Sequence, residues 1–335
     1  MTALPNRIQA IEFPALGEVS LVSHPFPPAP GPDEVLLRPD YLGICGTDLH
    51  VLHGKHPWVR PPVRTGHEVV ARVVAVGAAV TRFRPGQRVV VNPLLACGIC
   101  RACQAGRPNH CESAKVLGFR LPGLGSTYLN APAAQLHAVP DGLAPTLAVL
   151  AEPLAVGIHA VGRARDLHKV LIIGGGTIGL CVLLAARLAG AGPIDIVEPV
   201  AAKRALALRL GANAAHAPEA LTGLGGYSAV FDCVAAQATL DEACRATAGG
   251  GTMVVVGVAD AARALPLPRL QRFEIDVLGS GMYVPADIDA AIAALAAGEI
   301  AAGALISAIR PLAEAKDAYE QAGQRDSVKV LIDMG

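Results

Sequence analysis

The chain has 335 residues, a length that suits two domains. It is 52% hydrophobic and 17% charged with a formal net charge of zero, which argues against a disordered chain and against binding of nucleic acid through bulk charge. Its longest apolar runs are too short or too glycine-rich to span a bilayer, and its first residues lack the pattern of a signal peptide. We therefore expect a cytoplasmic protein.

The first 150 residues have the pattern of a β-rich domain. Alternating or β-branched runs at 34–44, 68–77 and 87–93 predict short strands, because such side chains fit a half-buried pleated surface. Between them stand segments dense in glycine and proline, such as PFPPAPGPDE and FRPGQ, which favour turns over helices.

The pattern changes near residue 150. Strand-like runs alternate with helix-like segments over residues 155–285, beginning with KVLIIGGGTIGLCVLLAARLAG and continuing through PIDIVEP and TMVVVGV. This alternation predicts βαβ units and a parallel sheet. Two helix-like segments and a closing strand, SVKVLIDM, end the chain.

A glycine motif joins the first of these strands to its helix. Gly174, Gly176 and Gly179 have the spacing G-x-G-x-x-G. The first glycine makes the tight turn, the second lets the backbone approach a pyrophosphate, and the third lets helix and strand pack closely. The helix N-terminus adds unpaired N–H groups. We expect a dinucleotide to be bound by Gly174, Gly176, Thr177, Ile178 and Gly179.

The next strand ends in Glu198, 19 residues after Gly179, where an acid binds the adenosine ribose hydroxyls. A carboxylate there repels a 2′-phosphate, so the sequence favours NAD over NADP. Lys203 and Arg204 follow about one helical turn later and weaken that preference. We include Lys203 among the cofactor-binding residues.

Four of the eight cysteines fall in the short segment 97–111. Disulfides are rare in a reducing cytosol, where clustered cysteines more often bind metal. Four thiolates on one lobe suit a closed zinc site that orders the loop and leaves no position for substrate. An iron–sulfur cluster also takes four cysteines, but nothing else in the chain suggests electron transfer. We expect a structural zinc bound by Cys97, Cys100, Cys103 and Cys111.

Catalysis then needs a second site. Cys45, His67, Glu68 and Glu152 offer a thiolate, an imidazole and carboxylates from separate segments, which are the ligand types of a catalytic zinc site. Each also has an ordinary interpretation as a core or surface residue, and composition alone does not separate the two. Glu152 lies in an apolar segment, where a carboxylate is rare unless it is paired or bound to metal.

In their order along nearly the whole chain, these motifs resemble the zinc-dependent medium-chain alcohol dehydrogenases, in the branch of the sorbitol, butanediol and threonine dehydrogenases. The matching segments are GICGTDLH, GHE, RPGQRVVVNP, the cysteine lobe, EPLAVGIHA, GGGTIGL and the closing strand. The resemblance implies an α/β fold with a GroES-like, β-rich catalytic domain over residues 1–152, a Rossmann domain with a doubly wound parallel sheet over 153–287, and a return to the catalytic domain over 288–335. The active site would lie in the cleft between them.

The resemblance also implies roles for residues. Cys45 and His67 match the fixed ligands of a catalytic zinc, and Glu68 or Glu152 would complete the ligand set, with exchange between them during turnover. Asp48 matches the acid that accepts the ring N–H of His67 and so fixes its tautomer.

Two further residues match a proton relay. Thr47 corresponds to the hydroxyl beside the substrate oxygen, and His50 to the outer end of a relay through the cofactor ribose, although His50 also fits an ordinary surface position. The implied reaction oxidises a secondary alcohol of a polyol, vicinal diol or sugar: zinc lowers the pKa of the alcohol, and hydride passes to NAD. The implied cofactors are one catalytic zinc, one structural zinc and NAD.

The expected substrate pocket departs from the family. Sorbitol dehydrogenases place an arginine–tyrosine pair over the polyol, whereas Met282 and Tyr283 stand at the matching positions here. The loop around Phe119 also differs, and Trp58 either lines the cleft mouth or belongs to the core. These departures argue against a long polyol and fit a smaller diol, a cyclic alcohol or a sugar acid.

Other functions are weighed against this one. A threonine or other amino-alcohol dehydrogenase is the main alternative, although the sequence shows no evident cation for the substrate carboxylate. A non-enzymatic zinc module would need a basic face, and a zinc-free quinone reductase would lack Cys45, His67 and the lobe. We expect a small-molecule alcohol as substrate, no nucleic acid or membrane partner, and a homotetramer, with a dimer as the alternative.

Overall fold

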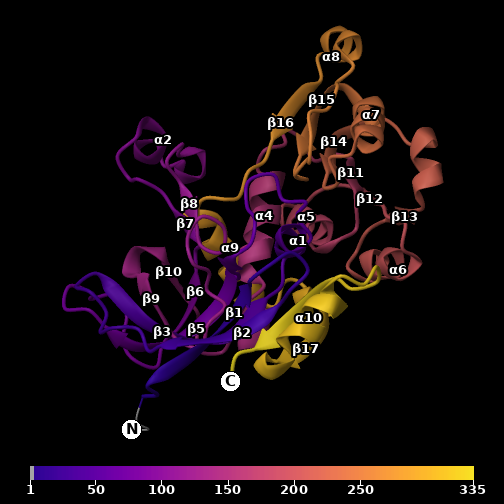
Figure 1. The fold of residues 1–335 in the computed structure, drawn as a ribbon. Coiled ribbons are helices and arrows are strands. Elements are labelled where there is room, and N and C mark those ends of the chain that lie inside the picture. Colours follow the sequence, from indigo (N-terminus) through magenta and orange to yellow (C-terminus); the bar gives the residue numbers. More distant parts are fainter. Residues whose placement is uncertain (1–3) are drawn as a thin grey trace. The chain divides into compact units, whose positions relative to one another are not determined.

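A computed structural model describes residues 4–335 (Figure 1). Its contacts divide the chain into two compact units. The first contains the segment up to Glu152 together with 295–297 and 306–335, and the second contains 153–294 and 298–305. Residue 288, where the sequence suggests a return to the first domain, lies inside helix α9 (Pro285–Ala297). Most of that helix belongs to the second unit.

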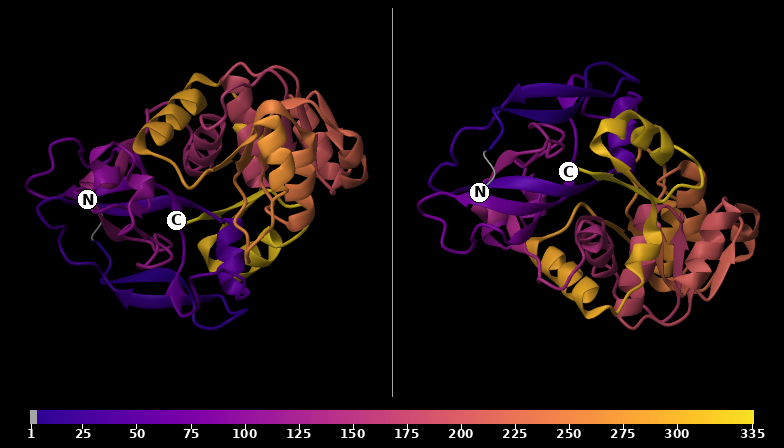
Figure 2. Two further views of the ribbon diagram at one scale, coloured as in Figure 1. Left: turned by 90° about the horizontal axis from the view of Figure 1, so that it is seen from above. Right: turned by 90° about the horizontal axis from the view of Figure 1, so that it is seen from below.

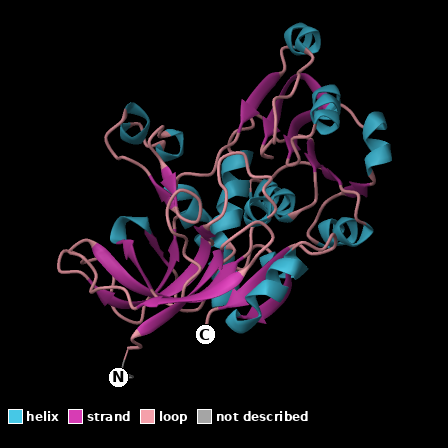
Figure 3. Cartoon of the chain, in the orientation of Figure 1, coloured by secondary structure: helices cyan, strands magenta, loops and turns pink. Residues whose placement is uncertain are grey.

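The first unit is rich in strands (Figure 3). Its main sheet has the order β10-β6-β5-β3-β18-β17, with β9 beside β3, and a smaller sheet has the order β2-β1-β4. The strand bounds are β1 Arg7–Phe13, β2 Ser20–Pro25, β3 Glu34–Gly43, β4 Val63–Arg64, β5 Glu68–Val76, β6 Arg88–Val91, β9 Leu129–Pro132, β10 Leu136–Ala138, β17 Ile306–Pro311 and β18 Lys329–Asp333.

Strand β18 returns from the end of the chain to lie between β3 and β17 in this sheet. It pairs antiparallel with β3, so that Leu331 lies opposite Gly43, and parallel with β17. The alternating apolar side chains of β3 and β5 meet in one core, to which helix α10 (Ala315–Ala322) adds Tyr319. The Tyr319 ring packs edge-on against Phe13 with centroids 5.1 Å apart. The core therefore depends on residues from both ends of the chain.

Smaller elements carry the functional segments of this unit. They are the helices α1 (Gly46–Leu52), α2 (Arg101–Gln104) and α3 (Pro145–Ala148), the short 3-10 helices Pro108–His110, Ala133–Gln135 and Leu312–Glu314, and the paired strands β7 (Leu94–Leu95) and β8 (Lys115–Val116). The β7–β8 pair closes the base of the segment that holds the four clustered cysteines.

The second unit contains a parallel sheet with the order β13-β12-β11-β14-β15-β16. This order reverses direction between β11 and β14, which is the doubly wound Rossmann arrangement expected from the sequence. The strand bounds are β11 Val170–Ile173, β12 Ile194–Val197, β13 Ala214–His216, β14 Tyr227–Asp232, β15 Thr247–Val255 and β16 Asp276–Gly279.

Among the described residues, four helices pack against this parallel sheet, and Figure 2 shows them in rose to orange. They are α5 Thr177–Leu188, α6 Ala201–Arg209, α7 Gln237–Ala246 and α8 Leu267–Phe273. The other helices are α4 Ala151–Val161 and α9 as above, with 3-10 helices at Pro218–Gly223 and Ala302–Leu305. β11 is buried along its whole length, as a strand covered on both faces should be. In residues 4–335 no helix combines the length and the apolar character needed to cross a bilayer.

Candidate active site

Cys45 stands at the turn between strand β3 and helix α1. It is the N-cap residue of α1, and its backbone N–H donates a 3.0 Å hydrogen bond to Asp48 Oδ2. Asp48 therefore caps the first turn of the helix, where a carboxylate also meets the positive end of the helix dipole. This local structure places the Cys45 thiol and the Asp48 carboxylate side by side.

Cys45, His67 and Glu68 form a compact group in the first unit. One ligand atom from each of the three lies within 4.8 Å of the others. His67 and Glu68 are buried, and Cys45 is half-buried. A thiol, an imidazole and a carboxylate converging at this spacing are a donor set that suits zinc with a position left for another ligand. The sequence expectation that these residues come together therefore has a geometric basis.

Asp48 also contacts His67. Its Oδ1 lies 3.5 Å from His67 Nδ1, which is an ion-pair distance rather than a good hydrogen bond, and it accepts a 2.8 Å hydrogen bond from Thr65 Oγ1. Burial raises the pKa of Asp48, but the His67 ring and the hydrogen bonds outweigh it and hold that pKa below its ordinary value. Burial likewise lowers the pKa of His67, yet Asp48 and Cys45 together raise it well above the ordinary value. The group without metal is thus arranged to hold a cation.

The carboxylate of Glu68 is bound by Lys329 from strand β18. Lys329 Nζ donates to both carboxylate oxygens, at 2.7 and 2.6 Å, and to the carbonyl of Ile44 at 2.9 Å. Gly43 lies opposite Glu68 in the β3–β5 ladder, and a Cβ at Gly43 would meet Glu68 Oε2 at 2.1 Å. Glycine is therefore required at position 43 to leave room for this ion pair.

The other expected residues of this site have different settings. Thr47 is half-buried, with its hydroxyl oxygen 3.5 Å from the Cys45 sulfur. His50 follows one turn later on the same helix and is exposed. Glu152 is buried in the first turn of α4 and does not belong to the group formed by Cys45, His67 and Glu68.

The four clustered cysteines lie close together without forming disulfides. The sulfur atoms of Cys97 and Cys103 are 3.9 Å apart, and those of Cys100 and Cys103 are 3.5 Å apart. Tetrahedral zinc with Zn–S bonds of about 2.3 Å places its sulfur ligands about 3.8 Å apart, whereas a disulfide bond is about 2.05 Å long. The spacing therefore fits a metal ion.

The acidity of these thiols also fits a cation site. Backbone N–H groups of Ile99 and Cys100, followed by the Cys111 thiol, lower the pKa of Cys97 to about 6. Desolvation and the neighbouring Cys100 thiol raise the pKa of Cys103 to about 12. One thiolate forms readily, and a further thiolate beside it requires a cation.

A wall of aromatic rings adjoins the Cys45–His67–Glu68 group. The Phe119 ring lies 5.1 Å from the His67 ring and stacks on His56 at 5.4 Å with an interplanar angle of 14°. Trp58 packs against His56 and is itself 72% exposed, so it does not belong to the core. The wall consists of Phe119, His56 and Trp58.

The glycine loop of the second unit connects β11 to α5. Gly174 has a φ of +98°, and a Cβ at Gly179 would lie 1.8 Å from the Gly174 carbonyl oxygen, so the helix packs against the turn as the motif requires. A Cβ at Gly176 would meet nothing within 4 Å. Gly176 is also the N-cap of α5, which begins at Thr177 with Ile178 in its first turn. Open space beside a helix N-terminus fits a pyrophosphate.

Glu198 is buried at the end of β12, next to this loop. Its two carboxylate oxygens accept hydrogen bonds from the backbone N–H groups of Gly175 and Val200, both at 2.8 Å. Arg204 donates hydrogen bonds to the backbone carbonyls of Glu198 and Pro199. The neighbouring Lys203 side chain is half-buried. The acid expected to contact ribose is thus held beside the glycine turn, as a dinucleotide site requires.

Known protein families match both the β-rich part of the chain and its Rossmann part. Residues 31–141 match the family model described as alcohol dehydrogenase GroES-like domain, and residues 177–297 match the one described as zinc-binding dehydrogenase. The chain is 32% identical to 2-dehydro-3-deoxy-L-galactonate 5-dehydrogenase of Pseudoalteromonas atlantica, with 91% of this chain and 93% of that protein covered. It is also 32% identical to sorbitol dehydrogenase of Gallus gallus, with 94% and 93% covered.

One solved structure is similar to nearly the whole of this chain. A protein from Sinorhizobium meliloti 1021, taken for a zinc-binding dehydrogenase and bound to NADP, has a TM-score of 0.91 and 33% sequence identity, with 98% of this chain and all of that chain covered. The chain belongs to the zinc-dependent medium-chain alcohol/polyol dehydrogenases. It is therefore an oxidoreductase of CH–OH groups that uses zinc and a nicotinamide cofactor. The predicted family and fold class are confirmed, and the non-enzymatic zinc module is set aside.

Two of the expected pocket residues of this dehydrogenase lie in its second unit. Met282 has a left-handed backbone with a φ of 51° and a half-buried side chain. Tyr283 is fully buried. The described contacts of the wall involve Phe119 and Trp58 but neither of these two residues.

Sequence reasoning missed three residues of the dehydrogenase's first unit. Lys329 binds Glu68, Thr65 binds Asp48, and His56 stands in the aromatic wall. A lone lysine at the start of an apolar strand was a usable signal for Lys329, because a buried ammonium needs a partner. Thr65 and His56 have no such local signal, since their contacts depend on how the chain folds back.

Proposed function

We propose that this dehydrogenase transfers hydride from a secondary alcohol of a polyol or sugar acid to a nicotinamide cofactor. The observation that carries the proposal is the convergence of Cys45, His67 and Glu68 within 4.8 Å in a largely buried setting. The two curated relatives described above act on a sugar acid and on sorbitol, by their names. An alcohol oxygen is the substrate group that this donor set, once loaded with zinc, is suited to bind.

The metal would be held by Cys45 and His67 as fixed ligands, with Glu68 or Glu152 as the third protein ligand. Zinc at this position supplies a Lewis acid that increases the acidity of the substrate alcohol. Asp48 supports the site by orienting the His67 ring, since it is itself tied to the Cys45 backbone and to Thr65. Lys329 binds the Glu68 carboxylate and so competes with a metal for that carboxylate.

Thr47 and His50 are proposed to carry the proton away. They are three residues apart on α1, and residues at this spacing share a helix face. Thr47 accepts the substrate proton near the Cys45 sulfur, and exposed His50 delivers it to water. The cofactor ribose is the proposed link between them.

A second zinc, held by Cys97, Cys100, Cys103 and Cys111, is proposed to be structural. The sulfur–sulfur distances of 3.9 and 3.5 Å support it, and four thiolates leave no open position for a substrate. Such an ion stabilises a lobe whose helices and strands are too short to form a core.

For the cofactor we propose NAD. Glu198 places a carboxylate beside the phosphate-binding turn and disfavours a 2′-phosphate, and Arg204 is already bound to backbone carbonyls. Gly174, Gly176, Thr177, Ile178 and Gly179 would contact the pyrophosphate, and Lys203 the adenosine end. The NADP-bound structural neighbour makes NADP the cofactor to compare.

We also propose a cytoplasmic homotetramer. All eight cysteines are free thiols, as a reducing compartment favours. Among residues 4–335, strand β16 ends the parallel sheet with an unpaired edge, and Leu267 and Phe273 are exposed on α8, which contacts β15. Light scattering of the purified protein measures the assembly.

The test is the reduction of nicotinamide, followed by absorbance with zinc-loaded protein. Sorbitol, galactitol, 2,3-butanediol, L-galactonate and L-threonine are each supplied with NAD and with NADP. Turnover of a polyol or sugar acid with NAD, lost in a folded Cys45→Ser variant, supports the proposal. Turnover of L-threonine alone would instead establish the amino-alcohol alternative.

A further inference from the structure

His56 is held rigidly in the aromatic wall, between Phe119 and the exposed Trp58. Its Nδ1 accepts hydrogen bonds from the backbone N–H groups of Trp58 and Val59, at 3.2 and 3.1 Å. A ring nitrogen that accepts carries no proton, so the neutral tautomer has its hydrogen on Nε2. Burial, together with the nearby His50 and Arg60, lowers the pKa of His56 and favours this neutral form.

The orientation of the ring is also determined by packing. One face stacks on Phe119, and the edge-on Trp58 ring lies 5.8 Å away. Within the part of the chain that the structure describes, Nε2 has no hydrogen-bond acceptor, and it is not among the fully buried polar atoms that lack a partner. His56 is 6% exposed, and its Nε2–H group is therefore a fixed, unpaired donor that is not completely buried.

Phe119 of the aromatic wall connects His56 to His67, one of the proposed metal ligands. Phe119 touches the His56 ring on one side and the His67 ring on the other, with centroid distances of 5.4 and 5.1 Å. All three residues belong to the first unit. A substrate bound at His67 thus has Phe119 beside it and His56 at the next position along the wall.

The guanidinium of Arg60 adds a positive charge near the His56 ring. Its Nη1 donates to the backbone carbonyls of His56 and Val59, and for residues 4–335 the structure gives it no carboxylate partner. Some other arginines of this unit pair with acids, such as Arg64 with Glu12 and Arg88 with Asp40. The Nε and Nη2 donors of Arg60 remain available, in the planar geometry that matches a carboxylate.

We propose that His56 Nε2–H and Arg60 bind the carboxylate of a sugar-acid substrate whose secondary alcohol is oxidised at the Cys45–His67 site. This inference rests on the proposed function and narrows it to sugar acids. A neutral hydroxymethyl group can accept a hydrogen bond from His56 but gains little from the Arg60 charge. The two residues therefore determine specificity for an acid over the corresponding polyol.

The test compares L-galactonate with galactitol, which has the same arrangement of secondary hydroxyls but no carboxylate. Binding to the zinc-loaded protein is measured by isothermal titration calorimetry. The protein with its natural sequence should bind L-galactonate at least tenfold more tightly than galactitol, and Arg60→Met should reduce this ratio about tenfold, the size of one charge-assisted hydrogen bond. His56→Phe, which keeps the stacked ring, should also weaken L-galactonate binding, and His56→Gln, which keeps an N–H donor, should restore part of it.

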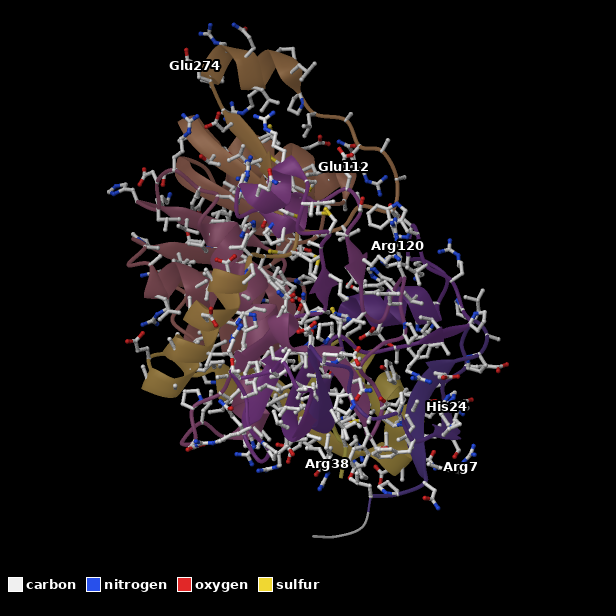
Figure 4. All side chains as sticks on the ribbon, turned by 90° about the vertical axis from the view of Figure 1, so that its left-hand side faces the viewer. Arg7, His24, Arg38, Glu112, Arg120 and Glu274 are labelled. Carbon is white, nitrogen blue, oxygen red and sulfur yellow. The ribbon has the colours of Figure 1, made fainter. Side chains whose placement is uncertain are left out.

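Arg120→Met is the matched control, because Arg120 is an exposed arginine directly after Phe119 (Figure 4). An equal loss in Arg120→Met and Arg60→Met would show a general charge effect and overturn the assignment. Equal affinity for L-galactonate and galactitol would overturn it as well. These binding results are separate from turnover: failure to oxidise any polyol or sugar acid contradicts the proposed function, whereas turnover without acid preference contradicts only the role of His56 and Arg60.

Discussion

The ammonium of Lys329 lies 2.6 Å from Glu68 Oε2, although 261 residues separate the two in the chain. Each side chain is 1% exposed, so both charges are out of water. The pair joins the last strand, β18, to the first residue of β5, directly after the metal-ligand candidate His67. The end of the chain thus supports the site formed by its beginning.

Replacing Lys329 by methionine should strongly destabilise the protein. The change leaves the Glu68 carboxylate buried without its partner, a situation that costs about 3–5 kcal/mol. Urea unfolding of the metal-free protein measures this loss. The double variant Glu68→Gln/Lys329→Met removes both charges and should recover a large part of it, whereas equal stability of the single and double variants would contradict a charge effect.

Asp48→Asn should weaken zinc binding at the Cys45–His67 site by about 10- to 100-fold, as loss of a carboxylate behind a metal-bound histidine does. The amide cannot stabilise the His67 ring as the carboxylate does. Competition with a chromophoric chelator measures the affinity. Asp40→Asn, on β3 but paired with Arg88 instead, should leave it unchanged. An unaltered affinity in Asp48→Asn would show that His67 is oriented by packing alone.

The stability of the metal-free protein should decrease as the pH rises above about 6.5, the unfolded value for histidine. Asp48 and Cys45 raise the pKa of His67 against the opposing effect of burial, so the folded state binds this proton more tightly than the unfolded state. The resulting stabilisation is complete below the unfolded pKa and is lost as the pH rises through the folded one. Urea unfolding at pH 6 to 9 measures the slope, which should flatten in His67→Asn.

Removing one cysteine of the lobe should remove one zinc. Cys97→Ser should contain one zinc ion per chain, against the two expected for the natural sequence, as measured by elemental analysis, because a three-thiolate site no longer closes around the metal. Cys233→Ser, in the second unit, is the control and should keep both. Two ions retained in Cys97→Ser would contradict a four-cysteine site.

Glu198→Gln should shift cofactor preference from NAD toward NADP. The change removes the negative charge that would face a 2′-phosphate and weakens the proposed acceptor for the ribose hydroxyls, so the KM for NAD should rise about tenfold while that for NADP falls. Initial rates with both cofactors measure it. Glu219→Gln, an exposed acid in the same unit, should change neither KM. An unchanged ratio of the two KM values would place the ribose elsewhere.

Much of this protein could be predicted from local sequence pattern. The turn at Gly174 and the close approach of Gly179 depend on residues within a few positions, and so do the capping of α1 by Asp48 and the grouping of the lobe cysteines. Backbone sterics and spacing determine such features wherever the segment stands. The order of strands and helices in the Rossmann sheet follows for the same reason, because hydrophobic period and connection length restrict the topology.

The tertiary structure decided the contacts between distant segments. The register that places Leu331 opposite Gly43 brings Lys329 to Glu68, and a shift of one residue would turn the lysine to the other face of the sheet. The stacking of His56 on Phe119, and of Phe119 against His67, likewise joins three segments that share no local pattern. The sequence by itself therefore determined the chemical groups and the local turns, whereas packing of the whole first unit decided which charge faces which metal-ligand candidate, because strand register and core packing are properties of the complete sheet.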